Sequence, residues 1–314
     1  MDFEHEKKWY PAVTDFNMHI DAGEMVALIG ESGCGKSITA LSMMGLQPPN
    51  TRIMGHMYLN GENGQEDLNE LTKKEWTSIR GKRISMIFQE PMTALNPLIK
   101  VGKQVRECLL THQKGISKKE AKSLVLEQLK SVGLPDVEDL YDCYPHQLSG
   151  GQRQRVGIAR ALAVDPDFIV CDEPISALDV SIQAQVINLL EQLQRERGLT
   201  YLFIAHDLGL VDLMCHQVAV MYLGNVVEWL EHGRIAEHCK HPYTKALMGA
   251  VFKVDFKPGE KIEPLEGEIP SPLDLPPGCP FASRCEHCTE HCVQVKPELK
   301  EVEHGHWVAC HLFD

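Results

Sequence analysis

The most constraining feature of this 314-residue chain is a glycine-rich segment at residues 30–37, with the sequence Gly-Glu-Ser-Gly-Cys-Gly-Lys-Ser. It directly follows the apolar run Met25–Ile29 and precedes a second apolar segment, Ile38–Leu46. A buried strand, a G-x-x-x-x-G-K-[ST] loop and a helix in this order form a phosphate-binding unit, because the loop amides and the helix N-terminus face an anion. A glycine-rich turn that binds nothing is the poorer reading in this context. The expected nucleotide-binding residues are Gly30, Glu31, Ser32, Gly33, Cys34, Gly35, Lys36, Ser37 and Ile38.

Two side chains of this segment have distinct expected roles. The Lys36 ammonium would reach the β- and γ-phosphates of a bound nucleotide, and the Ser37 hydroxyl would ligate Mg²⁺. The sequence therefore predicts ATP with Mg²⁺ as ligands.

Further short apolar runs alternate with segments of helical periodicity. The runs expected as strands are Met25–Gly30, Ile84–Gln89, Phe168–Asp172 and Tyr201–Ala205, and the helices are Lys118–Val132, Ser181–Arg197, Ile38–Leu46 and Arg153–Ala163. Strands that alternate with helices favour an α/β fold with a parallel sheet and right-handed crossovers. Two segments, Phe16–Ile20 and His56–Asn60, alternate in the manner of antiparallel strands.

Composition and charge exclude several classes of protein. With 43% hydrophobic and 24% charged residues the chain is not intrinsically disordered, and its net charge of −13 argues against bulk binding of nucleic acid. No apolar stretch reaches 18 residues, and the charged start Met1–Lys8 lacks the apolar region of a secretory signal. We therefore expect a cytosolic chain whose 11 cysteines are reduced thiols or metal ligands.

Two carboxylates end the apolar strand at residues 168–172. A strand of this kind places its last residue at the sheet edge where ligands bind, so Asp172 is expected in the Mg²⁺ shell and Glu173 as the general base for the attacking water. His206 ends the next strand and could contact the γ-phosphate from the same edge. Taken alone, an Asp-Glu pair at a strand end is more often a helix cap.

The pentapeptide Leu148–Gln152 (LSGGQ) opens a helix. Together with the phosphate loop, Asp172–Glu173, the segment 176–179 and His206, it makes the chain resemble an ABC-type ATPase cassette. The resemblance implies a RecA-like P-loop core with an antiparallel β subdomain and a helical subdomain at about residues 95–160. It also implies that Gln89 senses Mg²⁺ and the attacking water, and that Asp179 faces a dimer partner. The residues implied to contact ATP held by that partner are Ser149, Gly150, Gly151 and Gln152.

Four longer segments narrow the resemblance to the ATPases of oligopeptide/dipeptide importers, within the peptide and nickel importer family. They are Gln89–Pro97, Tyr144–Gln152, His241–Leu247 and Gly278–Cys285. On this resemblance, residues 1–240 form the ATPase domain and residues 241–314 a small, irregular, cysteine-rich extension. Features of the D-type and of the F-type subunit both occur, so the type stays open.

One expected contact with the nucleotide base has two candidates. Members of the family usually carry an aromatic residue that stacks on adenine, on an N-terminal strand that is expected to be shortened here, because only nine residues precede Tyr10. Tyr10 or Trp9 could supply that ring, and simple surface packing of both is an equal alternative.

The second half of the extension concentrates Cys and His residues, with Cys279, Cys285, Cys288, Cys292 and Cys310 in a loop-rich segment. Such a segment with little apolar content needs a metal centre or a similar constraint to fold. All-thiolate ligation suits a [4Fe–4S] cluster, mixed Cys/His ligation suits zinc, and unligated thiols remain an alternative. The family resemblance favours Cys279, Cys285, Cys292 and Cys310 as the ligands, with Cys288 as an additional thiol.

The expected function is ATP hydrolysis that powers the import of peptides or related small solutes. The resemblance implies a second ATPase subunit, with a paralogue favoured, two transmembrane permeases, and an extracytoplasmic solute-binding protein. It places the chain peripherally on the cytoplasmic face of the inner membrane, without a nucleic-acid partner. A nickel or metal-chelate importer is an alternative, and a soluble, non-transport ABC-type ATPase acting on DNA or ribosomes is a more distant one.

Overall fold

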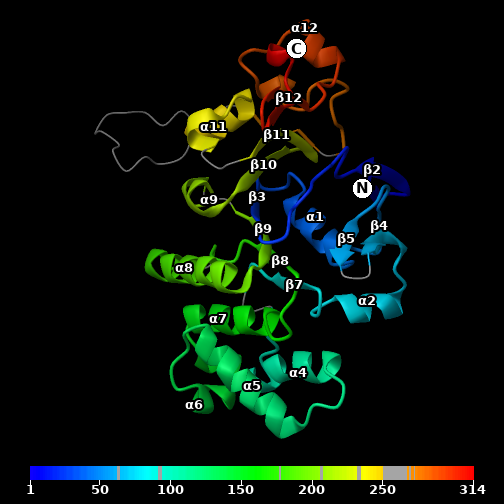
Figure 1. The fold of residues 1–314 in the computed structure, drawn as a ribbon. Helices are drawn as coiled ribbons and strands as arrows, with labels where there is room; N and C mark the ends of the chain where they lie inside the picture. The colour runs from blue at the N-terminus through cyan, green and yellow to red at the C-terminus, as the bar shows by residue number, and fades with distance from the viewer. Residues whose placement is uncertain are drawn as a thin grey trace. The chain divides into compact units, whose positions relative to one another are not determined.

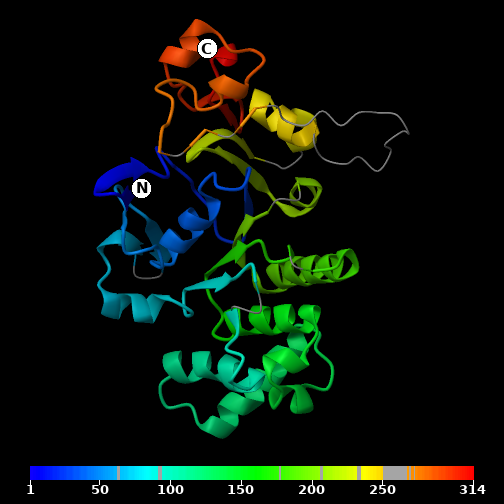
Figure 2. The same cartoon turned by 180° about the vertical axis from the view of Figure 1, so that it is seen from behind.

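The computed structural model describes residues 1–61, 64–90, 94–176, 178–205, 208–231, 235–249, 267–268, 270–271 and 273–314. These residues form two compact units (Figures 1 and 2). The first unit comprises Met1–Ile20, Met25–Met57 and Ala205–Asp314, and the second comprises Asp21–Glu24 and Tyr58–Ile204. The predicted linker after Val254 lies largely outside the described residues.

The first unit is built around the strand β3 (Met25–Ile29), every residue of which is buried. Strand β10 (Gln217–Tyr222) pairs with it in parallel, and β11 (Asn225–Glu231) pairs antiparallel with β10. The extension adds β13 (His306–Val308) beside β11 and β12 (Lys300–Glu303) beside β13. The helices of this unit are α1 (Lys36–Met43), α9 (Leu208–Met214), α10 (Ile235–His238), α11 (Pro242–Gly249) and α12 (Glu290–Gln294).

A small antiparallel sheet at the N-terminus completes the first unit. Strand β1 (Asp2–His5) lies between β2 (Lys8–Pro11) and β4 (Thr51–Arg52), and Arg52 donates to Asp2 at 2.7 Å. The prediction of a strand at Phe16–Ile20 is wrong. Burial alternates along these five residues as the pattern indicated, but their backbone is not part of a strand ladder.

The second unit holds three parallel strands, β7 (Ile84–Ile87), β8 (Phe168–Asp172) and β9 (Thr200–Ile204). An antiparallel hairpin of β5 (Tyr58–Gly61) and β6 (Gly64–Asp67) leads through η1 (Leu68–Glu70) to α2 (Lys73–Ile79). The antiparallel strand expected at residues 56–60 thus starts two residues later and ends one residue later.

Helices dominate the rest of the second unit. They are α4 (Val101–His112), α5 (Lys118–Ser131), α6 (Val137–Tyr141), η2 (Pro145–Gln147), α7 (Gly150–Ala161) and α8 (Val180–Arg197). Helix α5 shows why the periodicity was informative, because Ala121, Val125 and Leu129 lie four residues apart and are fully buried. Its N-terminus is capped by the Ser117 hydroxyl, which accepts from the Glu120 N–H. Helices α4 to α7 lie together in both views (Figures 1 and 2).

The parallel strands and long helices predicted from apolar periodicity are confirmed, with ends that agree to within three residues. Within the described part of the chain, no helix combines the length and apolar character needed to cross a membrane.

Candidate functional site

The loop between β3 and α1 has a backbone that only glycine permits at two positions. Gly30 has φ of +150°, and a Cβ there would lie 2.1 Å from the Met221 carbonyl oxygen. Gly35 has φ of +110° immediately before α1. These two glycines let the chain turn sharply from β3 into the helix, which leaves Ser32 and Gly33 exposed where an anion would approach.

Lys36 lies at the first position of α1 and is buried. Its ammonium group donates to the carbonyl oxygens of Gly30 at 2.7 Å and Glu31 at 3.0 Å. The lysine therefore holds the two ends of the loop together. Cys34 lies beside the Lys36 ammonium, and burial raises the pKa of its thiol, an effect that the neighbouring positive charge only partly offsets. Cys34 is therefore a neutral thiol packed under the loop, and Ser37 is exposed in the first turn of α1.

Of the two carboxylates, Asp172 is the last residue of β8 and Glu173 follows it directly, and both are buried. Glu173 has φ of 43°, a left-handed conformation that is strained for a residue with a Cβ, and its N–H donates to the Ile204 carbonyl oxygen at 3.0 Å. The Gln89 amide, just beyond β7, donates to Glu173 Oε2 at 2.6 Å. The structure thus brings together the two residues that were predicted to position and activate water.

The LSGGQ segment forms the N-terminus of α7. Ser149 is the cap residue, and its hydroxyl accepts from the Gln152 N–H while the Gln152 side chain accepts from the Ser149 N–H at 2.9 Å. This reciprocal capping box fixes the start of the helix. Ser149 and Gly150 are exposed and Gly151 is half-buried. The N-terminus of α7 is thus exposed to solvent in the single chain.

Three other residues, His206, Tyr10 and Trp9, were predicted as contacts of the nucleotide. His206 lies outside the described residues. Tyr10 is half-buried on β2, where its ring lies 5.9 Å from that of Phe3. Trp9 is more exposed and has the Arg52 guanidinium 4.5 Å from its ring centre. Both aromatic rings are thus on the surface of the N-terminal sheet, and the choice between them stays a prediction.

The four cysteines favoured as metal ligands line one cavity of about 60 Å³ in the extension. Cys279, Cys285, Cys292 and Cys310 share its wall with His287 and His311, whereas the exposed Cys288 does not line it. The Cys279 N–H donates to the Cys292 carbonyl oxygen at 2.7 Å. Burial, and then proximity to the other thiols, raises the pKa of Cys279 to about 11. Four cysteines that line one cavity are a donor set that suits a metal centre, because a cation removes the mutual repulsion that opposes ionisation of neighbouring thiols.

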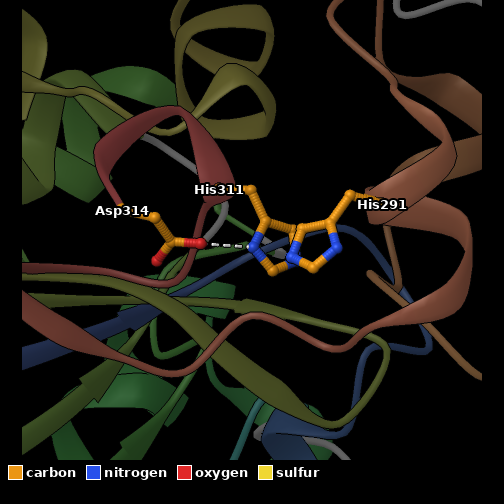
Figure 3. Close-up of side chains that lie close together, drawn as sticks. All are labelled: His291, His311 and Asp314. Atoms are coloured by element: carbon orange, nitrogen blue, oxygen red, sulfur yellow. Dashed lines mark hydrogen bonds and ion pairs between the residues drawn. The ribbon is translucent and has the colours of Figure 1, made fainter.

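His291, His311 and Asp314 form a second group of possible ligands (Figure 3), and His311 also lines the cavity. The two imidazole rings are 4.3 Å apart, and His311 Nδ1 lies 2.6 Å from Asp314 Oδ2. His311 Nε2 is hydrogen-bonded to the Val295 carbonyl oxygen at 2.9 Å. This backbone contact, followed by Asp314, raises the pKa of His311. Both ring nitrogens of His311 already have hydrogen-bond partners. We therefore interpret the group as structural: His311 and Asp314 fix the last turn, and His291 packs against the His311 ring.

One contact at the phosphate loop was missed by sequence reasoning. The Arg284 guanidinium, in η3 (Ala282–Arg284) of the extension, donates to both carboxylate oxygens of Glu31, at 2.7 and 3.1 Å. No local pattern announces a partner 253 residues away.

Comparison with known proteins gives two family matches and many relatives. A family model described as ABC transporter matches residues 13–176, and one described as oligopeptide/dipeptide transporter, C-terminal region, matches residues 227–292. The dipeptide transport ATP-binding protein DppD of Bacillus subtilis (strain 168) is 45% identical over 303 residues, which cover 96% of this chain and 89% of that protein. The oligopeptide transport ATP-binding protein OppF of Haemophilus influenzae is 45% identical over 301 residues, covering 95% and 88%.

Solved structures give a matching result. The dimeric post-hydrolysis state of the ATP-binding cassette MJ0796 bound to ADP and Pi aligns with a TM-score of 0.64 at 31% identity, covering 73% of this chain and 94% of that one. The cbiO1 structure from Clostridium perfringens aligns with a TM-score of 0.57 at 27% identity, covering 74% and 86%. These likenesses confirm the fold class expected from the sequence.

Proposed function

This chain belongs to the ABC transporter family of ATP-binding proteins, and on that premise we propose that it hydrolyses ATP to power the import of peptides. The peptide substrate is supported by the match of residues 227–292 to the C-terminal region of oligopeptide/dipeptide transporters. The observation that carries the hydrolytic role is the buried Glu173, whose carboxylate is held by Gln89 at 2.6 Å. A carboxylate fixed in this way is oriented before substrate arrives.

Each residue of the site has a proposed role. Lys36 and the amides of residues 30–38 bind and neutralise the phosphates, while Ser37, Gln89 and Asp172 provide oxygen ligands. Mg²⁺ held by these oxygens would offset charge on the β- and γ-phosphates. Glu173 accepts the proton of the attacking water, and the water is oriented by the Gln89 amide. His206 contacts the γ-phosphate.

The exposed start of α7 supports a composite site. We propose that Ser149, Gly150, Gly151 and Gln152 contact ATP bound by a second ATPase subunit, with a paralogue as the favoured partner. Gly150 and Gly151 present N–H groups, while the N–H groups of Ser149 and Gln152 are used by the capping box. Two permease subunits and an extracytoplasmic solute-binding protein complete the importer. The chain then acts at the cytoplasmic face of the inner membrane as a peripheral subunit.

The test compares Glu173→Gln with Glu127→Gln, a control on the exposed face of α5. We expect Glu173→Gln to lower ATP hydrolysis by roughly 10²- to 10⁴-fold, because the general base is lost, while ATP still binds. With its partner subunit and ATP, this variant should accumulate as a dimer in size-exclusion chromatography. Wild-type turnover by Glu173→Gln, measured with the partner, would contradict the proposal. Peptide uptake by reconstituted vesicles, with nickel uptake as the competing outcome, tests the substrate.

We propose further that Cys279, Cys285, Cys292 and Cys310 hold a [4Fe–4S] cluster, with zinc as the alternative. The position of these four cysteines around one cavity supports this ligand set. The four thiolates would hold the centre, which would supply cross-links to a segment that has little apolar core of its own. Cys288 is exposed and does not line the cavity, so it lies outside the proposed ligand set.

Metal content distinguishes the alternatives. After anaerobic purification, iron, sulfide and zinc are measured for the wild type, Cys292→Ser and the matched control Cys288→Ser. We expect Cys288→Ser to keep the wild-type content and Cys292→Ser to lose most of it, together with thermal stability. Equal metal content in all three proteins would exclude the proposed ligand set.

A further inference from the structure

We propose that Arg284 is a positioning residue for the phosphate loop, which it prepares for ATP by fixing and neutralising Glu31. The inference rests on the proposed function, since it concerns ATP binding at the same loop. It makes the cysteine-rich extension a working part of the nucleotide site rather than an appendage.

The ion pair between Arg284 and Glu31 is bidentate and largely shielded from water. Both terminal nitrogens of Arg284 donate to Glu31, one to each carboxylate oxygen. The Arg284 side chain is only 3% exposed, and that of Glu31 is 24% exposed. A bidentate pair shielded in this way is stronger and more directional than a surface pair, which water would screen.

Glu31 connects three of the groups that shape the loop. Its N–H donates to the Tyr243 hydroxyl at 2.8 Å, and its carbonyl oxygen accepts from the Lys36 ammonium at 3.0 Å. The third group is the Arg284 guanidinium, which contacts the Glu31 carboxylate. A shift of Glu31 would therefore move the carbonyl that holds the phosphate-binding lysine.

Arg284 is itself held in place by aromatic packing. Its guanidinium donates to the Tyr222 hydroxyl at 3.4 Å, and the Tyr222 ring packs against Tyr243 and Phe281 at 4.6 and 5.3 Å. All three rings are buried. Phe281 precedes Arg284 by three residues, so this short segment contacts Tyr222 at two neighbouring points.

The charge of Glu31 explains why such a clamp matters. A carboxylate in the second position of a phosphate-binding loop repels the anion that the loop must bind. Arg284 cancels this charge and keeps the carboxylate turned toward the guanidinium. An ATPase that lacks this arginine would retain the loop amides but would place an unpaired negative charge beside the phosphates.

The test is a double-mutant cycle on ATP affinity, in the hydrolysis-deficient Glu173→Gln background so that binding is read without turnover. We expect Arg284→Met to raise the Kd for ATP about tenfold, because Glu31 is left charged and unheld. Glu31→Gln should restore most of the affinity of Arg284→Met, since the repelling charge is gone. Arg83→Met, which breaks the ion pair with Asp167 in the second unit, is the matched control and should leave the Kd unchanged.

Each outcome decides one question. An unchanged Kd in folded Arg284→Met overturns the inference, and so does a double variant as weak as Arg284→Met, because the arginine would then act only through the fold of the extension. If Arg284→Met does not fold, Arg284→Lys is used: it keeps the charge but loses the bidentate geometry, and an intermediate Kd is expected. Failure of the parent to bind ATP at all would instead contradict the proposed function.

Discussion

At the scale of single residues, the extension contains a histidine whose burial should make the free energy of unfolding depend on pH. His241 is 1% exposed, and its Nδ1 accepts from the Tyr243 N–H. Burial lowers the pKa of His241 from 6.5 to about 4, against a weaker opposing effect of Glu228. The unfolded chain therefore binds a proton below pH 6.5 that the folded chain does not.

We predict that this histidine costs stability as the pH falls from 6.5 toward 4. From these pKa values the loss at about pH 5 is about 2 kcal/mol. His241→Asn, which keeps an acceptor for the Tyr243 N–H, should remove that part of the pH dependence in urea unfolding at about pH 7.5 and about pH 5. His304→Asn, at a fully exposed site, should leave it intact. Equal pH dependence in all three proteins would show that His241 titrates normally.

Residue roles were predictable from sequence where the chemistry is local. Lys36 follows its own glycine loop, and Asp172 ends an apolar run, so both were found from neighbouring residues alone. Gln89 and Glu173 are 84 residues apart, and only the family resemblance linked them. Arg284 had no signal, because an ion pair formed by the folded chain leaves no spacing to read.

At the scale of elements, two helices begin with the same capping motif but have different expected roles. Helix α7 starts with the Ser149–Gln152 capping box, and α2 starts with the Thr72–Glu75 capping box. Both satisfy backbone N–H groups that the helix leaves open. Only the first is expected to face ATP on a partner subunit.

We predict that Ser149→Ala and Thr72→Ala have similar effects on stability and different effects on catalysis. Each should lower the free energy of unfolding by about 1 kcal/mol, because one capping hydrogen bond is lost. Only Ser149→Ala should also reduce ATP hydrolysis in the assembled dimer. Denaturant unfolding and steady-state hydrolysis measure the two effects, and equal hydrolysis by both variants would remove α7 from the composite site.

Elements also show where sequence patterns mislead. Residues 16–20 keep the alternating burial that predicted a strand, yet they form no ladder. Alternation reports which side chains face the protein, whereas a strand also needs a neighbouring backbone with free donors and acceptors. The strands β12 and β13 were not predicted, because they have ladder partners but no clear alternating pattern. They are short, and β13 gains its stability from pairing with β11, which is distant in sequence.

At the scale of the whole molecule, the order of strands and helices in the sequence predicted the fold class. It did not predict how the C-terminal extension packs against the rest of the first unit. The extension joins that unit through β13, through the buried contact of His306 with Glu228 at 2.7 Å, and through Arg284. The first two contacts connect the last 40 residues to β11, and the third connects them to Glu31 in the phosphate loop. Periodicity within short windows cannot detect them, because each depends on segments that meet only after folding.

The pairing of Glu31 with Arg284 also sets an order of events during biosynthesis. The loop leaves the ribosome early, and its arginine is translated 253 residues later. At typical elongation rates this delay is roughly 13 to 50 seconds. A nascent chain therefore carries an unpaired acidic side chain in its loop until residue 284 has been made and folded, so on the inference above a shorter chain binds ATP more weakly.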